Sequence, residues 1–496
     1  MKKIIRTPWF WLIGLIVIYG ISRLTHLTTL PIFTDEAIYI RWAQIGGRDA
    51  SWRFISLTDG KQPLFTWAMM ITLRLFRDPL FAGRFASVAS GLFGMIGMYV
   101  LGNEVFRSKR IGVISSFLYV ISPFALFYDR LALYDSLVSA FSVWNLYVAI
   151  LLVRYVRLDI ALIFGLTLGI GMLNKTSAFF SLYFLPCTLI LFDWKTKQAG
   201  KRLFRWIGLV VISAVLSQLV YSILRLSPYF YIIAQKDTIF VYPFSLWVIH
   251  PFQFLVGNIT GMFNWLIGYM SWPIYLLAIV SLFFFRKSIC EKVLLLCWWL
   301  LPFGALGLFG RVLYPRHILF MIMPLLIMSA WTINTIFNRI KNRLLGCLCI
   351  ILICGMSIYS SYSIISDIKT ARIPKSEMGQ YIDDWPSGWG VSEIVSFLQN
   401  ESKTGKVSVF TEGTFGLLPY AFEIYLADIK NIDIHGIWPI PTEKPMDVIQ
   451  SAGSHPTYFV MYQNQTPPFQ WHLELLAEYQ KGLNKKSSMR LYKVLP

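Results

Sequence analysis

The chain has 496 residues, of which 56% are hydrophobic and only 14% are charged. Soluble globular proteins carry about a quarter charged residues, so this composition excludes an ordinary soluble domain and predicts a polytopic membrane protein. Lys and Arg (45) outnumber Asp and Glu (26), which gives a net charge of +19. In a soluble protein that excess would indicate nucleic-acid binding, but in a membrane protein the topology has to be tested first.

Eleven apolar runs are long enough, or nearly so, to cross a membrane as helices. They lie at about 8–27, 80–104, 111–128, 132–153, 159–174, 177–193, 206–225, 263–285, 291–310, 317–337 and 344–365. The first run follows a basic N-terminus like that of a signal peptide, but no small-residue cleavage site comes after it. It is therefore predicted to be an uncleaved first span.

Basic residues are concentrated in alternate loops. With the N-terminus in the cytoplasm, the loops on the cytoplasmic side carry Lys2, Lys3, Arg6, Arg107, Lys109, Arg110, Arg154, Arg157, Lys195, Lys197, Lys201, Arg202, Arg205, Arg286, Lys287, Lys292, Arg339, Lys341 and Arg343. This positive-inside pattern accounts for much of the charge excess without nucleic acid. It predicts a plasma or inner membrane protein whose working surface is extracytoplasmic.

The composition changes after the last span. Residues 367–496 hold no apolar run of spanning length. Val407–Glu412 and 457–462 are typical of buried strands, and 391–399 has the apolar spacing of a short amphipathic helix. We therefore predict a transmembrane domain over 1–366 and a small extracytoplasmic α/β domain over 367–496.

The first outer loop combines acidic and basic residues with apolar segments. Asp35 and Glu36 follow the first span and begin a stretch with helical spacing to Ala43, which predicts a helix in the membrane interface. A second short apolar segment covers 64–76, and the turn before it carries Lys61. Adjacent carboxylates at a membrane boundary cost free energy unless water, a cation or a substrate satisfies them.

A second group of charges lies at 128–136. Asp129 and Arg130 are predicted at a turn between two spans, and Asp135 about a turn and a half inside the next helix. A carboxylate at that depth either pairs with Arg130 to join two helices or faces a polar cavity.

Several cations are predicted at the same outer face: Lys61, Arg84, Arg130, Lys175, Arg316 and, beside the last of these, His317. Each long cation alone could extend to the interface. Together they lie at the depth of a lipid phosphate, which Lys and Arg bind. Since nucleotide-activated donors are absent outside the membrane, this pattern indicates a transferase that uses a polyprenyl-phosphate sugar, with a carboxylate as base or as ligand of a divalent cation.

The order of these motifs resembles the GT-C glycosyltransferases of the dolichyl-phosphate-mannose protein mannosyltransferase and aminoarabinose transferase type (family 39/83-like). The resemblance runs from about residue 8 to 193 and more weakly to Arg316. It is carried by six short elements: Thr34-Asp35-Glu36-Ala37, Lys61-Gln62-Pro63-Leu64, Gly83-Arg84-Phe85, the stretch from Asp129 to Ser136, Leu173-Asn174-Lys175-Thr176 and Tyr314-Pro315-Arg316-His317.

The resemblance implies a GT-C fold and an inverting transfer of sugar to an extracytoplasmic lipid, glycan or protein. Asp35 would be the catalytic acid/base residue, with Glu36 and Asp135 as further catalytic candidates, and Lys61 would lie near the lipid phosphate. Two features differ: Gly60 stands where aminoarabinose transferases have a glutamate, and the His-Pro-Pro element of the mannosyltransferases is missing. The donor sugar and the acceptor are therefore not carried over from either branch.

Three questions stay open at this point. A cofactor is not identified, and a divalent metal such as Mg²⁺ or Mn²⁺ would have Asp35 and Asp135 as ligands. A transporter or flippase of a lipid-linked saccharide would use similar charges, although no internal repeat with paired broken helices is evident. A structural or assembly protein would leave Asp35, Asp135 and Lys175 without a role.

Overall fold

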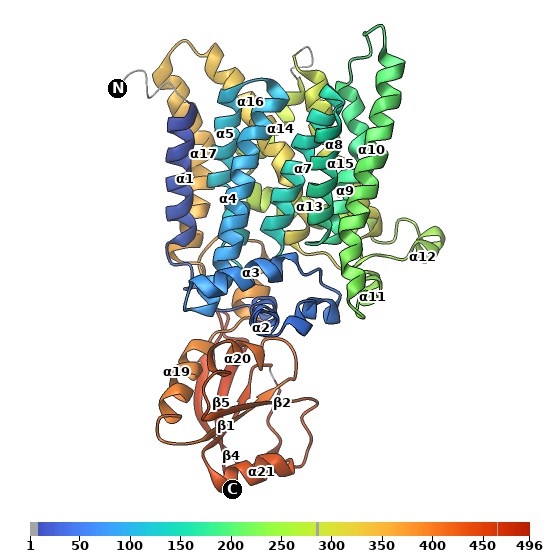
Figure 1. Ribbon diagram of the computed structural model, residues 1–496. Helices are drawn as coiled ribbons and strands as arrows, with labels where there is room; N and C mark the ends of the chain where they lie inside the picture. Colours follow the sequence, from blue (N-terminus) through green and yellow to red (C-terminus); the bar gives the residue numbers. More distant parts are fainter. Residues whose placement is uncertain (1–7, 284–286, 464) are drawn as a thin grey trace. The chain divides into compact units, whose positions relative to one another are not determined.

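The computed structural model describes residues 8–283, 287–463 and 465–496 and divides into two compact units (Figure 1). The first unit, here called the helical unit, comprises 1–25, 53–65 and 85–366. The second, called the C-terminal unit, comprises 26–52, 66–84 and 367–496, so two segments of the first outer loop belong to it. The predicted cytoplasmic residues Lys2, Lys3, Arg6 and Arg286 lie outside the described residues.

Helices make up nearly all of the helical unit. They are α1 (Pro8–Leu24), most of α4 (Pro79–Phe106), α5 (Lys109–Ile121), α6 (Pro123–Asp129), α7 (Asp135–Tyr155), α8 (Leu158–Met172), α9 (Phe180–Tyr183), α10 (Ala199–Tyr221), α11 (Ile232–Phe240), α12 (Phe244–Ile249), α13 (Leu255–Met270), α14 (Trp272–Phe283), α15 (Ile289–Phe309), α16 (Ile322–Arg339) and α17 (Arg343–Ser366). Short 3₁₀ segments are η2 (Ile55–Asp59), η3 (Thr176–Phe179), η4 (Leu185–Leu191), η5 (Ser222–Leu226) and η6 (Pro315–Met321).

Each of the eleven predicted spans corresponds to helical structure, but not all are straight. Within the described residues, six helical segments are long and apolar enough to cross a membrane: Pro79–Phe106, Asp135–Tyr155, Ala199–Leu226, Ile289–Phe309, Pro315–Arg339 and Leu344–Ser366. The pair α5 and α6 is bent by 63°, and the pair α13 and α14 by 108°. The first run and the runs at 159–174 and 177–193 form shorter apolar helices. The chain is thus a multi-pass membrane protein. The lengths of its described helices do not establish the predicted number of eleven crossings.

Small residues allow α8 and α10 to approach closely, as in other membrane bundles. A Cβ atom on Gly165 would lie 2.9 Å from the Ser213 carbonyl oxygen, and one on Gly169 would lie 2.7 Å from the Val220 Cβ. The Ser213 hydroxyl also donates to the Ala161 carbonyl at 2.8 Å. Close backbone approach and a hydrogen bond across the helices therefore replace the hydrophobic driving force that is missing in lipid.

The C-terminal unit contains a five-stranded sheet in the order β2-β1-β3-β5-β4. The strands are β1 (Val407–Glu412), β2 (Ile432–Ile437), β3 (Thr457–Met461), β4 (Leu473–Gln480) and β5 (Ser488–Val494). Strand β1 pairs in parallel with β2 and β3, whereas β5 pairs antiparallel with β3 and β4. The prediction of a small α/β domain is confirmed, and β1 has the predicted bounds.

Helices of this unit are α2 (Thr34–Arg48), α3 (Leu64–Leu75, whose first two residues belong to the helical unit), α18 (Lys375–Met378), α19 (Val391–Glu401), α20 (Tyr420–Leu426) and α21 (Met446–Ser454), with short helical segments at Ala50–Trp52, Gly379–Asp383 and Phe469–Trp471. The predicted helix after Asp35 is α2. It packs on α20 through ion pairs of Arg41 with Glu423 (2.6 Å) and Arg48 with Asp428 (2.5 Å). A segment of the first outer loop is therefore part of the C-terminal unit. The predicted domain boundary at residue 366 does not include this segment in that unit.

Candidate functional site

Four of the predicted site residues gather in the helical unit. Lys61, Lys175 and Arg316 each lie within electrostatic range of the His317 ring. We call these four residues the cationic cluster. Lys61, Lys175 and Arg316 are partly exposed, so a ligand can reach the cluster, whereas the His317 ring lies deeper. Because cations repel one another at short range, a group of this kind is stable only beside anions or an anionic ligand.

The segment before α16 fixes two members of the cluster. Pro315 begins η6, and the Tyr314 backbone N–H donates to His317 Nδ1 at 3.4 Å. A neutral imidazole that accepts at Nδ1 carries its proton on Nε2, which is then a hydrogen-bond donor. The Arg316 guanidinium carbon lies 4.8 Å from the Tyr314 ring centroid. Tyr314 thus orients both side chains.

Lys61 is held by a tight turn after η2. Gly60 has φ of 68°, a left-handed conformation that glycine adopts without strain, and the Lys61 N–H donates to the Ser56 carbonyl at 2.9 Å. Beyond the turn, the Leu64 N–H donates to the Leu173 carbonyl at 3.0 Å. This bond ties the turn that carries Lys61 to the segment that carries Lys175.

Helix α11 packs on this turn, and the sequence interpretation missed it. The Lys236 ammonium lies 2.5 Å from Asp59 Oδ1, and the Lys61 ammonium lies 5.3 Å from the Phe240 ring centroid. Phe240 also contacts the His317 ring, with centroids 6.2 Å apart. The Arg311 N–H donates to the Phe240 carbonyl at 2.8 Å, so the end of α11 is joined to the segment that leads to Arg316. In the sequence, the adjacent charges Lys236-Asp237 between two predicted spans were the available signal.

Asp237 brings a carboxylate to the cluster. It is half-buried on α11, three residues before Phe240 and therefore on the same side of the helix. Burial raises the pKa of Asp237, and the nearby Lys61 ammonium opposes that rise.

The sequence predicts Asp135 about a turn and a half inside a helix. In the structure it is the first residue of α7. The chain between Asp129 and Asp135 is not part of α6 or α7, so the helix starts later than the apolar run does. Its carboxylate lies 2.8 Å from the Lys175 ammonium and near the positive end of the helix dipole. The structure thus pairs Asp135 with Lys175, and the alternative pairing with Arg130 stays a prediction.

Asp129 and Arg130 instead hold the end of α1. Asp129 is fully buried and accepts hydrogen bonds from four side chains: Tyr19, Arg23, Tyr119 and Ser136. Arg130 Nη1 donates to the carbonyls of Ser22, Arg23 and Thr25 at 2.7–3.1 Å. These contacts satisfy carbonyl groups that a helix end leaves unpaired. They describe a structural role for Arg130, whose predicted role toward substrate stays a prediction.

The other predicted site residues, Asp35, Glu36 and Arg84, lie in the C-terminal unit. Arg84 binds Glu36 through two hydrogen bonds of 2.8 Å and donates to the carbonyls of Leu27 and Leu30. Both charged side chains are fully buried. Asp35 is the second residue of α2 and, unlike Glu36, is partly exposed. Of the two adjacent carboxylates, only Asp35 thus presents surface to solvent.

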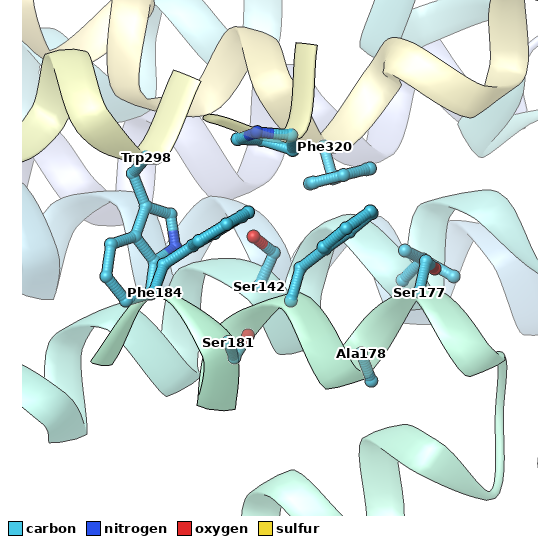
Figure 2. A pocket seen from close by; sticks show the side chains of 10 residues that line it. Ser142, Ser177, Ala178, Ser181, Phe184, Trp298 and Phe320 are labelled. Carbon is cyan, nitrogen blue, oxygen red and sulfur yellow. The ribbon is translucent and has the colours of Figure 1, made fainter. Parts of the chain in front are cut away.

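A small cavity of about 10 Å³, room for about one water molecule, lies in the helical unit beside the elements that carry the cluster. Figure 2 shows its aromatic wall, formed by Phe184, Trp298 and Phe320, and the hydroxyls of Ser142 and Ser177. Ser177 follows Lys175 by two residues, and Phe320 follows His317 by three. The cavity therefore lies on two of the segments that also carry cluster residues, in an apolar part of the bundle.

A metal site is not evident in the part of the chain that the structure describes, where no group of three or more His, Cys, Asp and Glu side chains is arranged to hold an ion. Asp35 and Asp135, the predicted ligands, belong to different units. The cationic cluster itself suits an anion.

These features define a class of protein: a multi-pass membrane protein with the GT-C glycosyltransferase fold. Residues 60–221 match the model of the dolichyl-phosphate-mannose-protein mannosyltransferase family. This region contains Lys61, Arg84, Asp135 and Lys175. The resemblance recognised from the sequence is confirmed. A comparison with curated proteins finds no match.

Solved structures share the fold over nearly the whole chain. ArnT from Cupriavidus metallidurans bound to undecaprenyl phosphate matches with a TM-score of 0.63 at 14% identity, covering 98% of both chains. Its apo state gives 0.60 at 13% identity, covering 98% of this chain and 97% of ArnT. The archaeal oligosaccharyltransferase AglB from Archaeoglobus fulgidus, in complex with an inhibitory peptide and a dolichol-phosphate, gives 0.52 at 12% identity, covering 92% of this chain and 69% of AglB. Identities this low establish the fold alone.

Proposed function

We propose that the chain is an inverting glycosyltransferase that moves a sugar from a polyprenyl-phosphate donor to an extracytoplasmic acceptor. The observation that carries this proposal is the cationic cluster, an open group of three cations and a histidine on a membrane protein of the GT-C fold. The matched ArnT structure contains undecaprenyl phosphate, and the matched AglB structure contains a dolichol-phosphate. A lipid phosphate is therefore the ligand that suits the cluster.

The cluster would act on the leaving group. In the transfer, the bond between the anomeric carbon and the phosphate oxygen breaks, and its electron pair stays on the phosphate. Lys61, Lys175 and Arg316 would stabilise this growing negative charge, and the Nε2–H of His317 would add a neutral donor. Since the charge grows toward the transition state, these contacts would raise the rate as well as the affinity.

The aromatic wall in Figure 2 is proposed to contact the isoprenoid chain, although the cavity beside it is too small to hold a lipid unit. The wall is apolar, and it lies on the same elements as Lys175 and His317. A lipid whose phosphate reaches the cluster would extend its first units along this wall.

Asp35 is proposed as the base that takes the proton of the acceptor hydroxyl as the new bond to the anomeric carbon forms. Direct displacement inverts the configuration of that carbon. Between the two adjacent carboxylates we choose Asp35, since Glu36 is buried in its pair with Arg84. A carboxylate already bound by a guanidinium is a poor base. Asp135 is proposed to hold the Lys175 ammonium, so its part in the catalysis is indirect.

The proposed topology follows the charge pattern. Within the described loops, the basic clusters at 107–110 and 195–205 would face the cytoplasm. The N-terminus would then be cytoplasmic and residues 367–496 extracytoplasmic.

The test is turnover by the purified full-length protein in lipid nanodiscs with a panel of polyprenyl-phosphate sugars. We expect transfer or hydrolysis with one donor, and a loss of 10²-fold or more, on the order expected for a general base, in Asp35→Asn. Donor binding should stay within about threefold of wild type, because a base acts mainly in the transition state. Movement of the lipid-linked sugar across liposome membranes without any turnover would refute the transferase and indicate a flippase.

A further inference from the structure

Helix α11 places the Asp237 carboxylate beside the cations of the cluster. The proposed reaction predicts a role for this negative charge. A polyprenyl-phosphate sugar is a phosphodiester with one negative charge. The lipid that remains after transfer is a phosphate monoester, which carries nearly two negative charges near neutral pH because its second pKa is about 6. A site made only of cations would therefore bind its product more tightly than its donor.

The contacts of α11 fix Asp237 at this position. A Cβ atom on Gly60 would lie 2.7 Å from the Lys236 Cβ and 2.9 Å from the Ile232 carbonyl oxygen, so the helix rests directly on the turn before Lys61. The ion pair of Lys236 with Asp59 joins the same two elements.

The opposite end of α11 is also held. The Phe240 ring lies under the Lys61 ammonium, and Val241 forms a bridge with Gly310. Asp237 lies one turn before Phe240 on this side of the helix, within electrostatic range of Lys61 and of the Tyr221 ring. Because both ends of α11 are held, the Asp237 carboxylate cannot easily move away from a bound phosphate.

We propose that Asp237 is a specificity-determining residue that weakens the binding of the lipid phosphate monoester more than that of the phosphodiester donor, and so promotes product release. This inference rests on the proposed function. One negative charge at Asp237 repels a dianion twice as strongly as a monoanion. If its removal strengthens binding of a monoanion about threefold, it strengthens binding of a dianion about tenfold.

The experiment uses two probes that need no knowledge of the sugar: undecaprenyl phosphate and its methyl phosphodiester. Equilibrium binding of both to the full-length protein is measured at a pH of about 8, where the monoester is a dianion. For Asp237→Asn we expect an affinity gain of about tenfold for the monoester and about threefold for the diester. Asp237→Glu keeps the charge and should keep the wild-type ratio of the two affinities.

Asp193→Asn serves as the matched control. It removes the same charge from an exposed aspartate that precedes α10 in the chain and should change neither affinity. Equal changes for both probes in Asp237→Asn, or no change, would overturn the role of Asp237 and leave the proposed function standing. If wild type binds neither probe, the lipid-phosphate site itself is refuted, and the inference is refuted with it.

Discussion

Two carboxylate–cation pairs of the molecule look alike in sequence and differ in surroundings. Glu36 and Arg84, in the C-terminal unit, are both fully buried, and each oxygen of the carboxylate receives a guanidinium N–H. Asp135 and Lys175, in the helical unit, form a single contact of 2.8 Å, and the lysine side chain keeps 30% of its surface exposed. The first pair is closed, with its hydrogen bonds directed at protein groups. The second is open and shares its lysine with the cationic cluster.

The difference separates stability from function. A buried ion pair is costly to break because the remaining charge has no partner and no water. A partly exposed pair can lose a partner at little cost and accept a ligand in its place. Substitutions in the closed pair should therefore lower stability, and substitutions in the open pair should lower activity.

The largest expected effect is the loss of the closed pair. Arg84→Ala would leave the buried Glu36 carboxylate without its positive partner and the carbonyls of Leu27 and Leu30 without their donor, at a cost of about 3–5 kcal/mol. We expect poor recovery of folded protein from the membrane, measured by size-exclusion chromatography and thermal unfolding. The double variant Glu36→Gln with Arg84→Met removes both charges and should be recovered better than Arg84→Ala. Equal recovery of Arg84→Ala and wild type would show that the pair is not closed.

Opening the second pair should affect activity instead. Lys175→Met removes one cation of the cluster and should lower kcat/KM for the donor about tenfold or more, the value of one charge-assisted contact. Its melting temperature should fall less than that of Arg84→Ala, since Lys175 is partly exposed whereas both members of the closed pair are fully buried. A large loss of stability with unchanged kcat/KM in the folded fraction would reverse the comparison.

Gly60→Ala tests how strictly the open cluster is positioned. The positive φ and the close approach of Lys236 and the Ile232 carbonyl both oppose a Cβ atom, at a cost of about 1–2 kcal/mol. Because the strain falls on the turn before Lys61, the KM for the donor should rise several-fold while kcat changes less. Steady-state kinetics separate the two. Gly453→Ala, on the C-terminal unit with open space around its Cβ position, is the control and should behave as wild type.

The last prediction concerns a third arrangement, a buried cation whose hydrogen bonds go to backbone carbonyls. Lys481 is fully buried and donates to the carbonyls of Trp385 (2.9 Å) and Tyr462 (3.2 Å). Burial lowers the pKa of Lys481 to about 7. Above that pH, the unfolded chain binds a proton that the folded unit has lost, so this group makes stability rise with pH until the ordinary lysine pKa is reached.

Thermal unfolding of wild type and Lys481→Met between pH 7 and about pH 10 measures this contribution, since lysine ordinarily titrates near 10.4. The variant should lose the part of the pH dependence that Lys481 supplies. Identical slopes in the two proteins would show that Lys481 remains protonated in its buried position.

The elements were predictable where their pattern is local. The bounds of β1 and the start of α19 follow from runs of apolar residues with the spacing of a strand or a helix. The bend between α13 and α14 and the late start of α7 were not predictable. The apolar composition continues through the point where a helix is interrupted. Nor does periodicity show that α2 joins residues more than 380 positions away, as Arg41 does with Glu423.

The site was predictable as a set of residue types and only partly as an arrangement. Lys61, Lys175, Arg316 and His317 were chosen because charges are expensive near lipid, and that cost is set by sequence. The same argument also selected Arg84 and Arg130, since composition cannot show whether a charge is satisfied by protein groups. Asp237 and Lys236 were missed because they lie outside the predicted spans, where charges are ordinary, although the structure places them on α11.

The most direct test of the central claim is binding of undecaprenyl phosphate to the full-length protein and to the double variant Lys61→Ala with Lys175→Ala. Lys430→Ala, an exposed lysine of the C-terminal unit, is the control. The cationic cluster as a lipid-phosphate site predicts a loss of affinity of about 10²-fold in the double variant, at roughly tenfold for each charge-assisted contact, and no change in the control. Wild-type affinity in a folded double variant would contradict the account.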